Sequence, residues 1–426
     1  MPSPTHRARL SHLMVRGWPL PLALLWLPTL YAATLLPTPT AGRPGAEPFA
    51  LCLICGDRGG ADVVLNLALF VPLGLLAKRR FGTLGAVAIG AALSTGIEVA
   101  QLFLPGRFST LADLISNTTG ALVGVALYRS LHALARGARP HGAVGTMMAA
   151  FAAGVVMLGG WLVAPAPTDE AYWGQWTPDF GPGTRYTGTV LAAAFNGRPF
   201  PSARLPPSTA GRDELLRDWT LTGTVQKGPP TGIATSVLSI FDARQEEILY
   251  LGAHKEHLLL RERLRAQDWR LDRPELVSWD ALAPVAEGRA MRLSTRRVGD
   301  DRCLGVDGHE VCDLGFTPGR LWSLLLYPSG APPWLQRLAD GAWMFVLFLP
   351  IGLFASSRRS ALADMVLAAG LVALAAAATR LLLDPLLELA GAFMGVLFGY
   401  AVAAALCRIG GGTARCHPSS PRGASD

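Results

Sequence analysis

The stretch 62–124 decides the fold, because polar residues recur in it at helical spacing within runs that are otherwise apolar. It opens with DVVLN (62–66) and FVPLG (70–74), continues with STGIEVAQ (94–101), and closes on Arg107, Asp113, Asn117, Gly120 and Gly124. Carboxylates, amides and arginines are costly in lipid, so in membrane helices they mark a functional site by default. The stretch therefore predicts helices that carry a site, provided that the runs around it cross a membrane.

Composition places the chain among membrane proteins. Half of its 426 residues are hydrophobic and only 16% are charged, a balance that suits several spans and one water-exposed part. The formal net charge is +7, but the basic residues flank apolar runs instead of forming one patch. Such flanking charge is the usual orientation signal of membrane helices, so we expect no nucleic-acid partner.

Eight apolar runs are long enough to cross a bilayer as helices, which takes about 20 residues. They are 18–36, 61–77, 84–104, 111–131, 144–164, 334–355, 362–383 and 386–407. The first run also fits a cleaved secretory signal, but its length and the spans that follow favour a retained helix. Arginine-rich turns alternate with acidic or mixed turns, so the positive-inside rule puts both termini in the cytoplasm.

Spacing within the apolar runs repeats. The motif D-x7-F-x-P-x-G begins at Asp62 and again at Asp340, and a second spacing of Asp and Gly begins at Asp113 and again at Asp384. In the second copy Met344 replaces Asn66, and Glu388 replaces Asn117. We predict two four-helix repeats of parallel topology, the second one degenerate and interrupted by an inserted domain.

The predicted fold class is an α-helical multi-pass membrane protein with eight spans in two repeats, plus an extracytoplasmic all-β sandwich domain. The expected parts are the first repeat (1–142), the first helix of the second repeat (143–164), the β-sandwich (165–333), the remaining three helices (334–409) and a disordered cytoplasmic tail (410–426). The sandwich is expected because charges, prolines and period-two alternation replace the apolar runs there.

The first repeat resembles the VanZ-like family of bacterial membrane proteins over residues 60–131. The resemblance rests on Asn66, Phe70, Pro72, Gly74, Glu98, Gln101, Arg107, Asp113, Asn117 and Gly120. It implies a four-helix module of the bacterial inner membrane and a link to glycopeptide (teicoplanin) resistance, but no particular reaction. The segment 165–333 is similar to laminin-G or concanavalin A-like sandwiches, which implies that it binds glycan or protein.

The polar residues form stripes on the predicted helices, because residues three or four apart share a face. The predicted topology places six of them at one depth, in the outer half of the bilayer: Asn66, Glu98, Gln101, Arg107, Asp113 and Asn117. One interpretation is an outward-facing ligand pocket, in which Arg107 pairs with Glu98 or Asp113 or binds an anionic head group. The other is that these groups bond only to each other and fix helix packing.

Cysteine spacing predicts a disulfide. VDGH (306–309) is typical of a two-residue hairpin turn, and Cys303 and Cys312 lie equally far from it, at a non-hydrogen-bonded pair where Cα atoms approach to about 4.5 Å. Cys52 and Cys55 are expected to form a second, smaller disulfide, the alternatives being a redox pair or half of a metal site. No second C-x-x-C or histidine cluster completes such a site, so we expect no metal and no cofactor.

Three functions fit the sequence. The first is a non-enzymatic or transporter-like envelope protein that binds membrane lipid, a lipid-linked ligand or glycan, or another cell-envelope protein. The second is an intramembrane enzyme with Glu98 or Asp113 as general acid/base. The third is an adhesion or scaffold protein that works through its β-domain alone. A nucleophile elbow, a P-loop and a zinc-protease signature are all absent from the sequence, which favours the first function over the second.

Overall fold

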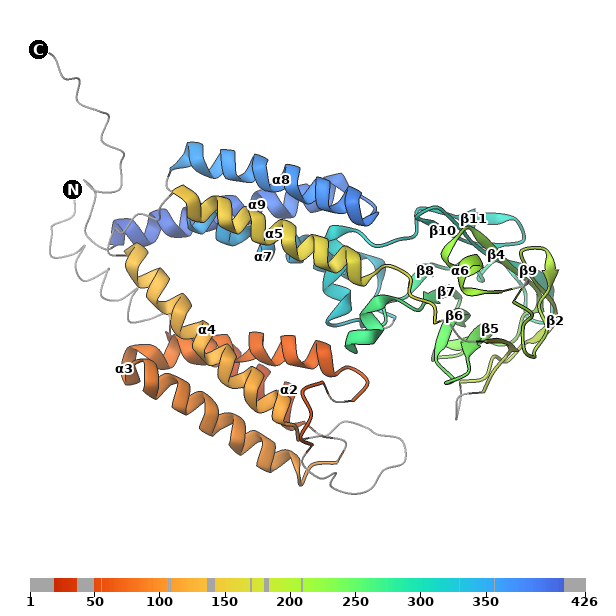
Figure 1. Cartoon of the computed structure of the whole chain (residues 1–426), viewed down its shortest axis with the longest axis horizontal. Coiled ribbons are helices and arrows are strands. Elements are labelled where there is room, and N and C mark those ends of the chain that lie inside the picture. The colour runs from red at the N-terminus through yellow and green to blue at the C-terminus, as the bar shows by residue number, and fades with distance from the viewer. Residues whose placement is uncertain are drawn as a thin grey trace, which may run out of the picture.

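The computed structural model describes residues 19–36, 50–54, 56–105, 107, 109–135, 142–168, 171–179, 184–207, 210–328, 330–355 and 357–409. Within these ranges the chain has two groups of helices and a β region at one end of them (Figure 1). The predicted tail 410–426 lies outside the described residues, as does Cys55 of the predicted Cys52–Cys55 bridge.

The first helical group consists of α2 (Pro19–Leu35), α3 (Gly59–Gln101) and α4 (Leu111–Ala135). α3 contains two of the predicted runs, because its backbone leaves helical geometry at Gly82 (φ 72°, ψ −171°), a conformation that glycine adopts without steric cost. The two halves of α3 lie side by side (Figure 1), and a Cβ placed on Gly90 in the second half would lie 3.8 Å from the Leu73 side chain in the first. α3 is therefore a helical hairpin.

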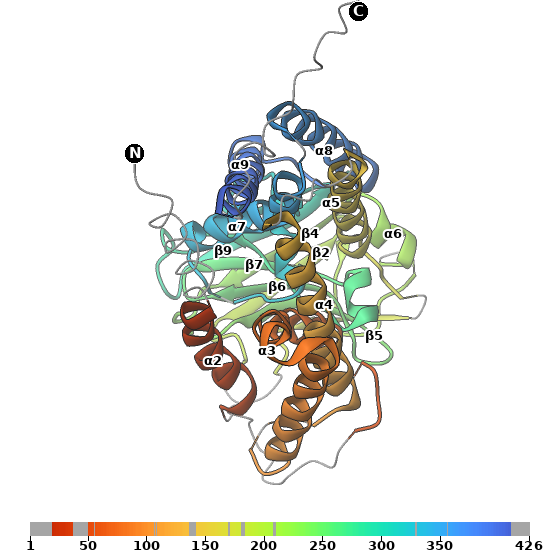
Figure 2. The same ribbon diagram turned by 90° about the vertical axis from the view of Figure 1, so that its left-hand side faces the viewer.

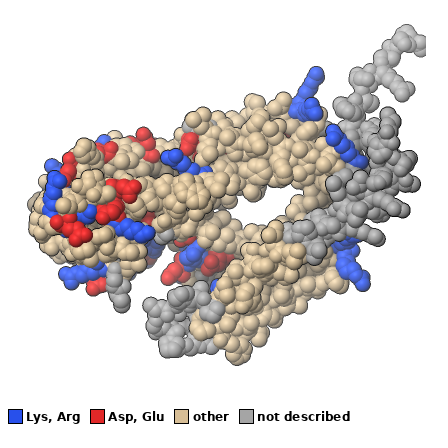
Figure 3. Space-filling view, turned by 180° about the vertical axis from the view of Figure 1, so that it is seen from behind, with Lys and Arg blue, Asp and Glu red and all other residues tan. Residues whose placement is uncertain are grey.

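The second helical group consists of α5 (Gly142–Leu162), α7 (Pro333–Leu353), α8 (Arg358–Thr379) and α9 (Pro385–Ile409). Figure 2 looks along the helices and separates this group from the first, and α4 contacts α9 where the groups meet. Of the described helices, α3, α4, α5, α8 and α9 are long and apolar enough to cross a membrane. Lys and Arg gather at the helix ends away from the β region (Figure 3). These features agree with a helical membrane part.

Glycines bring α3 and α4 into backbone contact. A Cβ placed on Gly74 would lie 1.8 Å from the Ala121 carbonyl oxygen. From the other side, a Cβ on Gly120 would lie 2.2 Å from the Leu67 carbonyl oxygen. Both distances are far below van der Waals contact, so only glycine permits this approach. Such small-residue contacts are the usual means by which membrane helices pack closely.

The same arrangement joins α7 and α9. A Cβ placed on Gly352 would lie 1.9 Å from the Val396 carbonyl oxygen, and one on Gly395 would lie 2.3 Å from the Phe345 carbonyl oxygen. Gly352 occupies the place of Gly74 in the repeated motif. By its contacts, Gly395 occupies the place of Gly120.

This packing corrects the alignment expected from the sequence. The spacing paired Gly120 with Gly391, whereas the contacts pair it with Gly395, one helical turn later. Glu388 stands seven residues before Gly395, as Asp113 stands seven before Gly120, so Glu388 is the counterpart of Asp113 and not of Asn117. The spacing misled because small residues recur every four positions along α9, and each turn offers an equally good match.

The β region comprises two antiparallel sheets. The five-stranded sheet has the order β1 (Tyr172–Trp176), β5 (Thr235–Asp242), β6 (Glu247–His254), β7 (His257–Glu262) and β8 (Leu276–Ser278). The six-stranded sheet has the order β11 (His309–Val311), β10 (Asp301–Val306), β9 (Ala290–Val298), β4 (Trp219–Gln226), β2 (Thr189–Phe195) and β3 (Arg198–Pro199). Short helices α6 (Arg212–Leu216), η1 (Arg265–Trp269) and η2 (Pro318–Leu324) complete it. Both sheets share one hydrophobic core, which continues through η2 into the second helical group.

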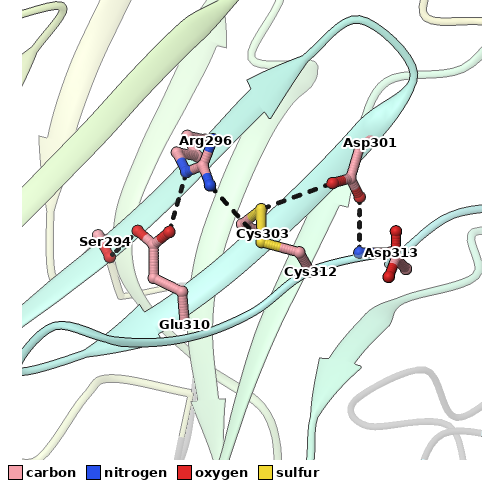
Figure 4. The surroundings of a disulfide bond; sticks show 7 residues. All are labelled: Ser294, Arg296, Asp301, Cys303, Glu310, Cys312 and Asp313. Carbon is pink, nitrogen blue, oxygen red and sulfur yellow. Dashed lines mark hydrogen bonds and ion pairs between the residues drawn. A yellow bond between two sulfur atoms is a disulfide. The ribbon is translucent and has the colours of Figure 1, made fainter.

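The hairpin of β10 and β11 confirms the predicted disulfide (Figure 4). Asp307 (φ 50°) and Gly308 (φ 88°) form its turn, and Val306 pairs with His309. That register brings Cys303 opposite Cys312, with Cα atoms 4.1 Å apart and the sulfur atoms bonded. The bridge closes an edge of the six-stranded sheet.

The N-terminal end of α3 rests on the β region. Arg58 forms an ion pair with Asp272 (2.9 Å), and the Gly60 amide donates to the Arg270 carbonyl (3.2 Å). A Cβ placed on Gly60 would lie 1.9 Å from the Trp269 carbonyl oxygen. The β region therefore lies at the same end of the first helical group as the start of α3.

Gly74→Ala should destabilise the protein by about 1–3 kcal/mol, because the added methyl group forces α3 away from α4. The measurement is the unfolding midpoint of the purified protein in detergent. Gly96→Ala is the matched control, since it lies on the same helix with nothing within 4 Å of the added Cβ and should leave the midpoint unchanged or slightly higher. Equal midpoints for the two variants would contradict the close packing.

Replacing Cys303 and Cys312 together with serine should lower the free energy of unfolding of the β region by about 2–3 kcal/mol, the amount expected for releasing a short closed loop. Unfolding followed with and without a reductant measures the effect. Reduction should destabilise the wild-type protein and leave the double variant unchanged. A wild type that is insensitive to reductant would contradict a stabilising bridge.

Candidate functional site

The six predicted site residues lie at the end of the first helical group that faces the β region. Asn66 is near the start of α3, Glu98 and Gln101 are at its end, and Asp113 and Asn117 are in the first turns of α4. Arg107 lies in the connection between α3 and α4. The helical hairpin at Gly82 brings the start and the end of α3 to the same end of the helical group. Glu98, Gln101 and Asn117 are buried.

Glu98 holds the start of α4. Its Oε2 accepts hydrogen bonds from the Ser109 hydroxyl (2.9 Å) and from the Thr110 amide (2.9 Å). Thr110 in turn caps α4, because its hydroxyl accepts from the Asp113 amide (3.1 Å), the pattern expected of a threonine N-cap. Sequence reasoning missed Ser109 and Thr110, although a threonine three residues before an acidic residue is a recognised helix-start signal.

Asn66 and Asp113 connect α3 to α4. The Asn66 amide donates to Asp113 Oδ1 at 2.6 Å, on the same pair of helices that meet at Gly120 and Leu67. The Asp113 carboxylate also interacts with the Thr110 side chain, whereas Glu98 Oε1 accepts no side-chain hydrogen bond within the described part of the chain. Glu98 therefore uses one carboxylate oxygen for structure and keeps the other.

Two buried amides are only half satisfied. The Asn117 amide donates to the Ser94 hydroxyl (2.9 Å), and the Gln101 amide donates to the Thr34 carbonyl of α2 (2.9 Å). Asn117 Oδ1 and Gln101 Oε1 are buried and have no partner among the described residues. A buried acceptor without a partner lowers the stability of the folded protein by about 1–3 kcal/mol. A hydrogen-bond donor bound beside these two oxygens would remove that cost.

Arg107 caps α2. Its guanidinium donates to the carbonyl oxygens of Leu36 (2.7 Å) and Ala32 (3.5 Å), which lie at the C-terminal end of that helix, where free carbonyls and the helix dipole attract cations. It forms no ion pair with Glu98 or Asp113, in contrast to one of the expectations from the sequence. Burial lowers the pKa of Arg107 and nearby Asp62 opposes this, yet an arginine remains charged at neutral pH.

In the second helical group, the carboxylates at the corresponding positions accept hydrogen bonds from the β region. Asp340, the counterpart of Asp62, accepts a hydrogen bond from the Trp322 indole (2.6 Å). Glu388, the counterpart of Asp113, accepts from the Gly319 amide (2.6 Å). Both donors belong to η2 of the β region. Each carboxylate thus holds η2 against the second helical group.

Comparison with known proteins finds one family. Residues 22–133 match the VanZ/LLP1 family model, and no curated protein and no solved structure matches the chain. The matched residues span α2, α3 and α4 and include all six predicted site residues. The first helical group is thus VanZ-like, as the sequence predicted, and it begins with the helix whose end Arg107 caps.

Glu98→Ala should destabilise the first helical group by about 1–3 kcal/mol for each lost partner, since the Ser109 hydroxyl and the Thr110 amide both lose their acceptor. Glu98→Gln keeps one acceptor oxygen and should fall between Ala and wild type. Unfolding midpoints in detergent measure the order of stability. A Glu98→Ala protein as stable as wild type would show that Glu98 does not hold the start of α4.

Proposed function

We propose that this chain is a multi-pass protein of the bacterial cell membrane whose VanZ-like helices bind, or move, an amphipathic or lipid-linked ligand of the cell envelope. The ligand would occupy a polar pocket that opens outward beside Asn66, Glu98, Gln101, Arg107, Asp113 and Asn117. The β region would recognise glycan or protein outside the membrane, in the manner of laminin-G or concanavalin A-like sandwiches. The VanZ-like match extends the proposal to glycopeptide (teicoplanin) resistance.

The observation that carries this proposal is the pair of unpartnered acceptors, Asn117 Oδ1 and Gln101 Oε1. A cluster that served packing alone would be expected to satisfy its own polar atoms, because unpaired buried groups are rare and costly. Glu98 also keeps one carboxylate oxygen that accepts no side-chain hydrogen bond among the described residues. A ligand with hydroxyl or amide donors, such as a sugar-bearing lipid, would satisfy these acceptors.

The proposed layout has eight spans in two four-helix repeats with both termini cytoplasmic. The break at Gly82 supports two spans within α3, and the shared glycine contacts of α3 with α4 and of α7 with α9 support the repeat. The basic ends of the helices lie away from the β region (Figure 3). By the positive-inside rule these ends are cytoplasmic, and the β region is outside.

A second candidate is an intramembrane enzyme acting on an envelope lipid or glycan. It is favoured by the Glu98 oxygen that accepts no side-chain hydrogen bond among the described residues, since general acid/base chemistry needs an available carboxylate. A third is an adhesion or scaffold protein, for which the β region would suffice.

Native mass spectrometry of the purified full chain tests the pocket. We expect a co-purifying lipid or glycan, and Gln101→Leu with Asn117→Leu should lower its occupancy about 10- to 100-fold, as two lost hydrogen bonds of about 1 kcal/mol each imply. The matched control is Thr95→Val with Thr118→Val, because these hydroxyls bond only to their own helix backbone, one on α3 and one on α4. A bare wild-type protein, or equal loss in the control, would count against the pocket.

A further inference from the structure

A hollow of about 250 Å³ lies where the second helical group meets the β region. Its walls come from the ends of α5 and α8, from η1, and from β9 and β10, and α5 and α8 both point at the β region (Figure 1). It is separate from the polar residues of the VanZ-like helices, which all belong to the first helical group. The function proposed above gives this hollow no role.

The hollow is strongly basic. Four arginines line it against one aspartate: Arg265, Arg297, Arg302, Arg380 and Asp300. Glu262 pairs with Arg302 (3.0 Å), and Asp300 lies 3.7 Å from Arg380. Asp218 also lies close enough to act on Arg297. Three carboxylates thus stand against four guanidinium groups, which leaves an excess of one positive charge.

Arg297 is the uncompensated cation. Its side chain extends from the end of β9, is 7% exposed, and donates only to the carbonyl oxygens of Gly299 (3.0 Å) and Leu215 (3.4 Å). Within the described residues, no carboxylate lies within ion-pair distance of it. Burial lowers the pKa of Arg297; Glu262 opposes this and Arg302 adds to it. A buried charge without a counter-ion is costly, so a bound anion beside Arg297 would stabilise the site.

The hollow lies at the ends of two helices of membrane-spanning length. α5 ends at Leu162 and α8 at Thr379, and both helices are long and apolar enough to span a membrane. Trp161, in the last turn of α5, is 43% exposed and its ring lies 5.2 Å from the Arg265 guanidinium. Exposed tryptophan beside arginine is typical of the membrane–water boundary. Apolar walls from Phe316 and Leu382 complete an amphipathic site.

We propose that this hollow binds the phosphate-bearing head group of an anionic membrane lipid, with Arg297 as the central cation and the acyl chains lying along α5 and α8. Guanidinium groups match phosphate oxygens in geometry and charge. An anion between Arg297, Arg302 and Arg265 would offset the buried positive charge. The proposal concerns the second helical group and does not depend on a ligand in the VanZ-like helices.

The test compares lipids on the full chain in detergent. Added phosphatidylglycerol should raise the thermal unfolding midpoint more than phosphatidylcholine does, and native mass spectrometry should give its affinity. Arg297→Gln should weaken phosphatidylglycerol binding about tenfold or more, as expected for a lost charge-assisted hydrogen bond. Arg292→Gln is the matched control, because it removes the same charge from an exposed position on the same strand and should change affinity little.

If Arg297→Gln does not fold, Arg265→Gln with Arg380→Gln replaces it, since both side chains lie at the more exposed side of the hollow; the expected loss is again tenfold or more. Equal binding of the two lipids, or equal loss in Arg292→Gln, would overturn the proposal. Inorganic phosphate that stabilises the wild type as strongly as phosphatidylglycerol would also overturn it, by showing that the occupant is a free anion. A bare pocket in the VanZ-like helices would leave these outcomes unaffected.

Discussion

Backbone contact between helices is the constraint on which this structure depends. In lipid there is little hydrophobic gain in bringing two apolar helices together, so close van der Waals packing must hold them. Gly74 and Gly120 allow α3 and α4 to touch backbone to backbone, and Gly352 and Gly395 do the same for α7 and α9. The two pairs share one geometry, since a Cβ on Gly74 or Gly352 would meet the carbonyl of the facing helix at 1.8 or 1.9 Å.

The ends of the helices show how polar groups are accommodated beside that packing. Glu98 accepts from the start of α4, and Arg107 donates to the end of α2, so two of the six candidate residues complete helix termini whose backbone groups would otherwise lack partners. These roles are structural, yet they do not exhaust the cluster. Asn117 and Gln101 each retain a buried acceptor with no partner in the described chain. The contacts between the helices provide no hydrogen-bond donor for these two amide oxygens.

Much of the fold could be predicted because its signals are local. Apolar runs predicted the helices, and period-two alternation predicted a β region at 165–333, where the structure has two antiparallel sheets. The Cys303–Cys312 bridge followed from a turn whose geometry fixes its register. Contacts between distant parts of the chain were harder to predict. The four-residue spacing of glycines in α9 left the alignment ambiguous by one turn, and nothing in the sequence around Arg297 indicates that it faces Arg265 and Arg380 across a hollow.

The two helical groups share their packing but differ in what their polar ends contact. In the first group Asp113 bonds to Asn66 within the bundle. In the second, Met344 stands in place of Asn66 and offers no donor, and Glu388 turns instead to the Gly319 amide of η2. Asp340 likewise bonds to Trp322. The carboxylates of Asp340 and Glu388 thus hold η2 of the β region, whereas Asp113 and Glu98 bond to Asn66 and to the start of α4. Because Met344 offers no amide donor beside Glu388, the nearest donor for that carboxylate is the backbone of η2, and this explains why Glu388 bonds outside its own helices.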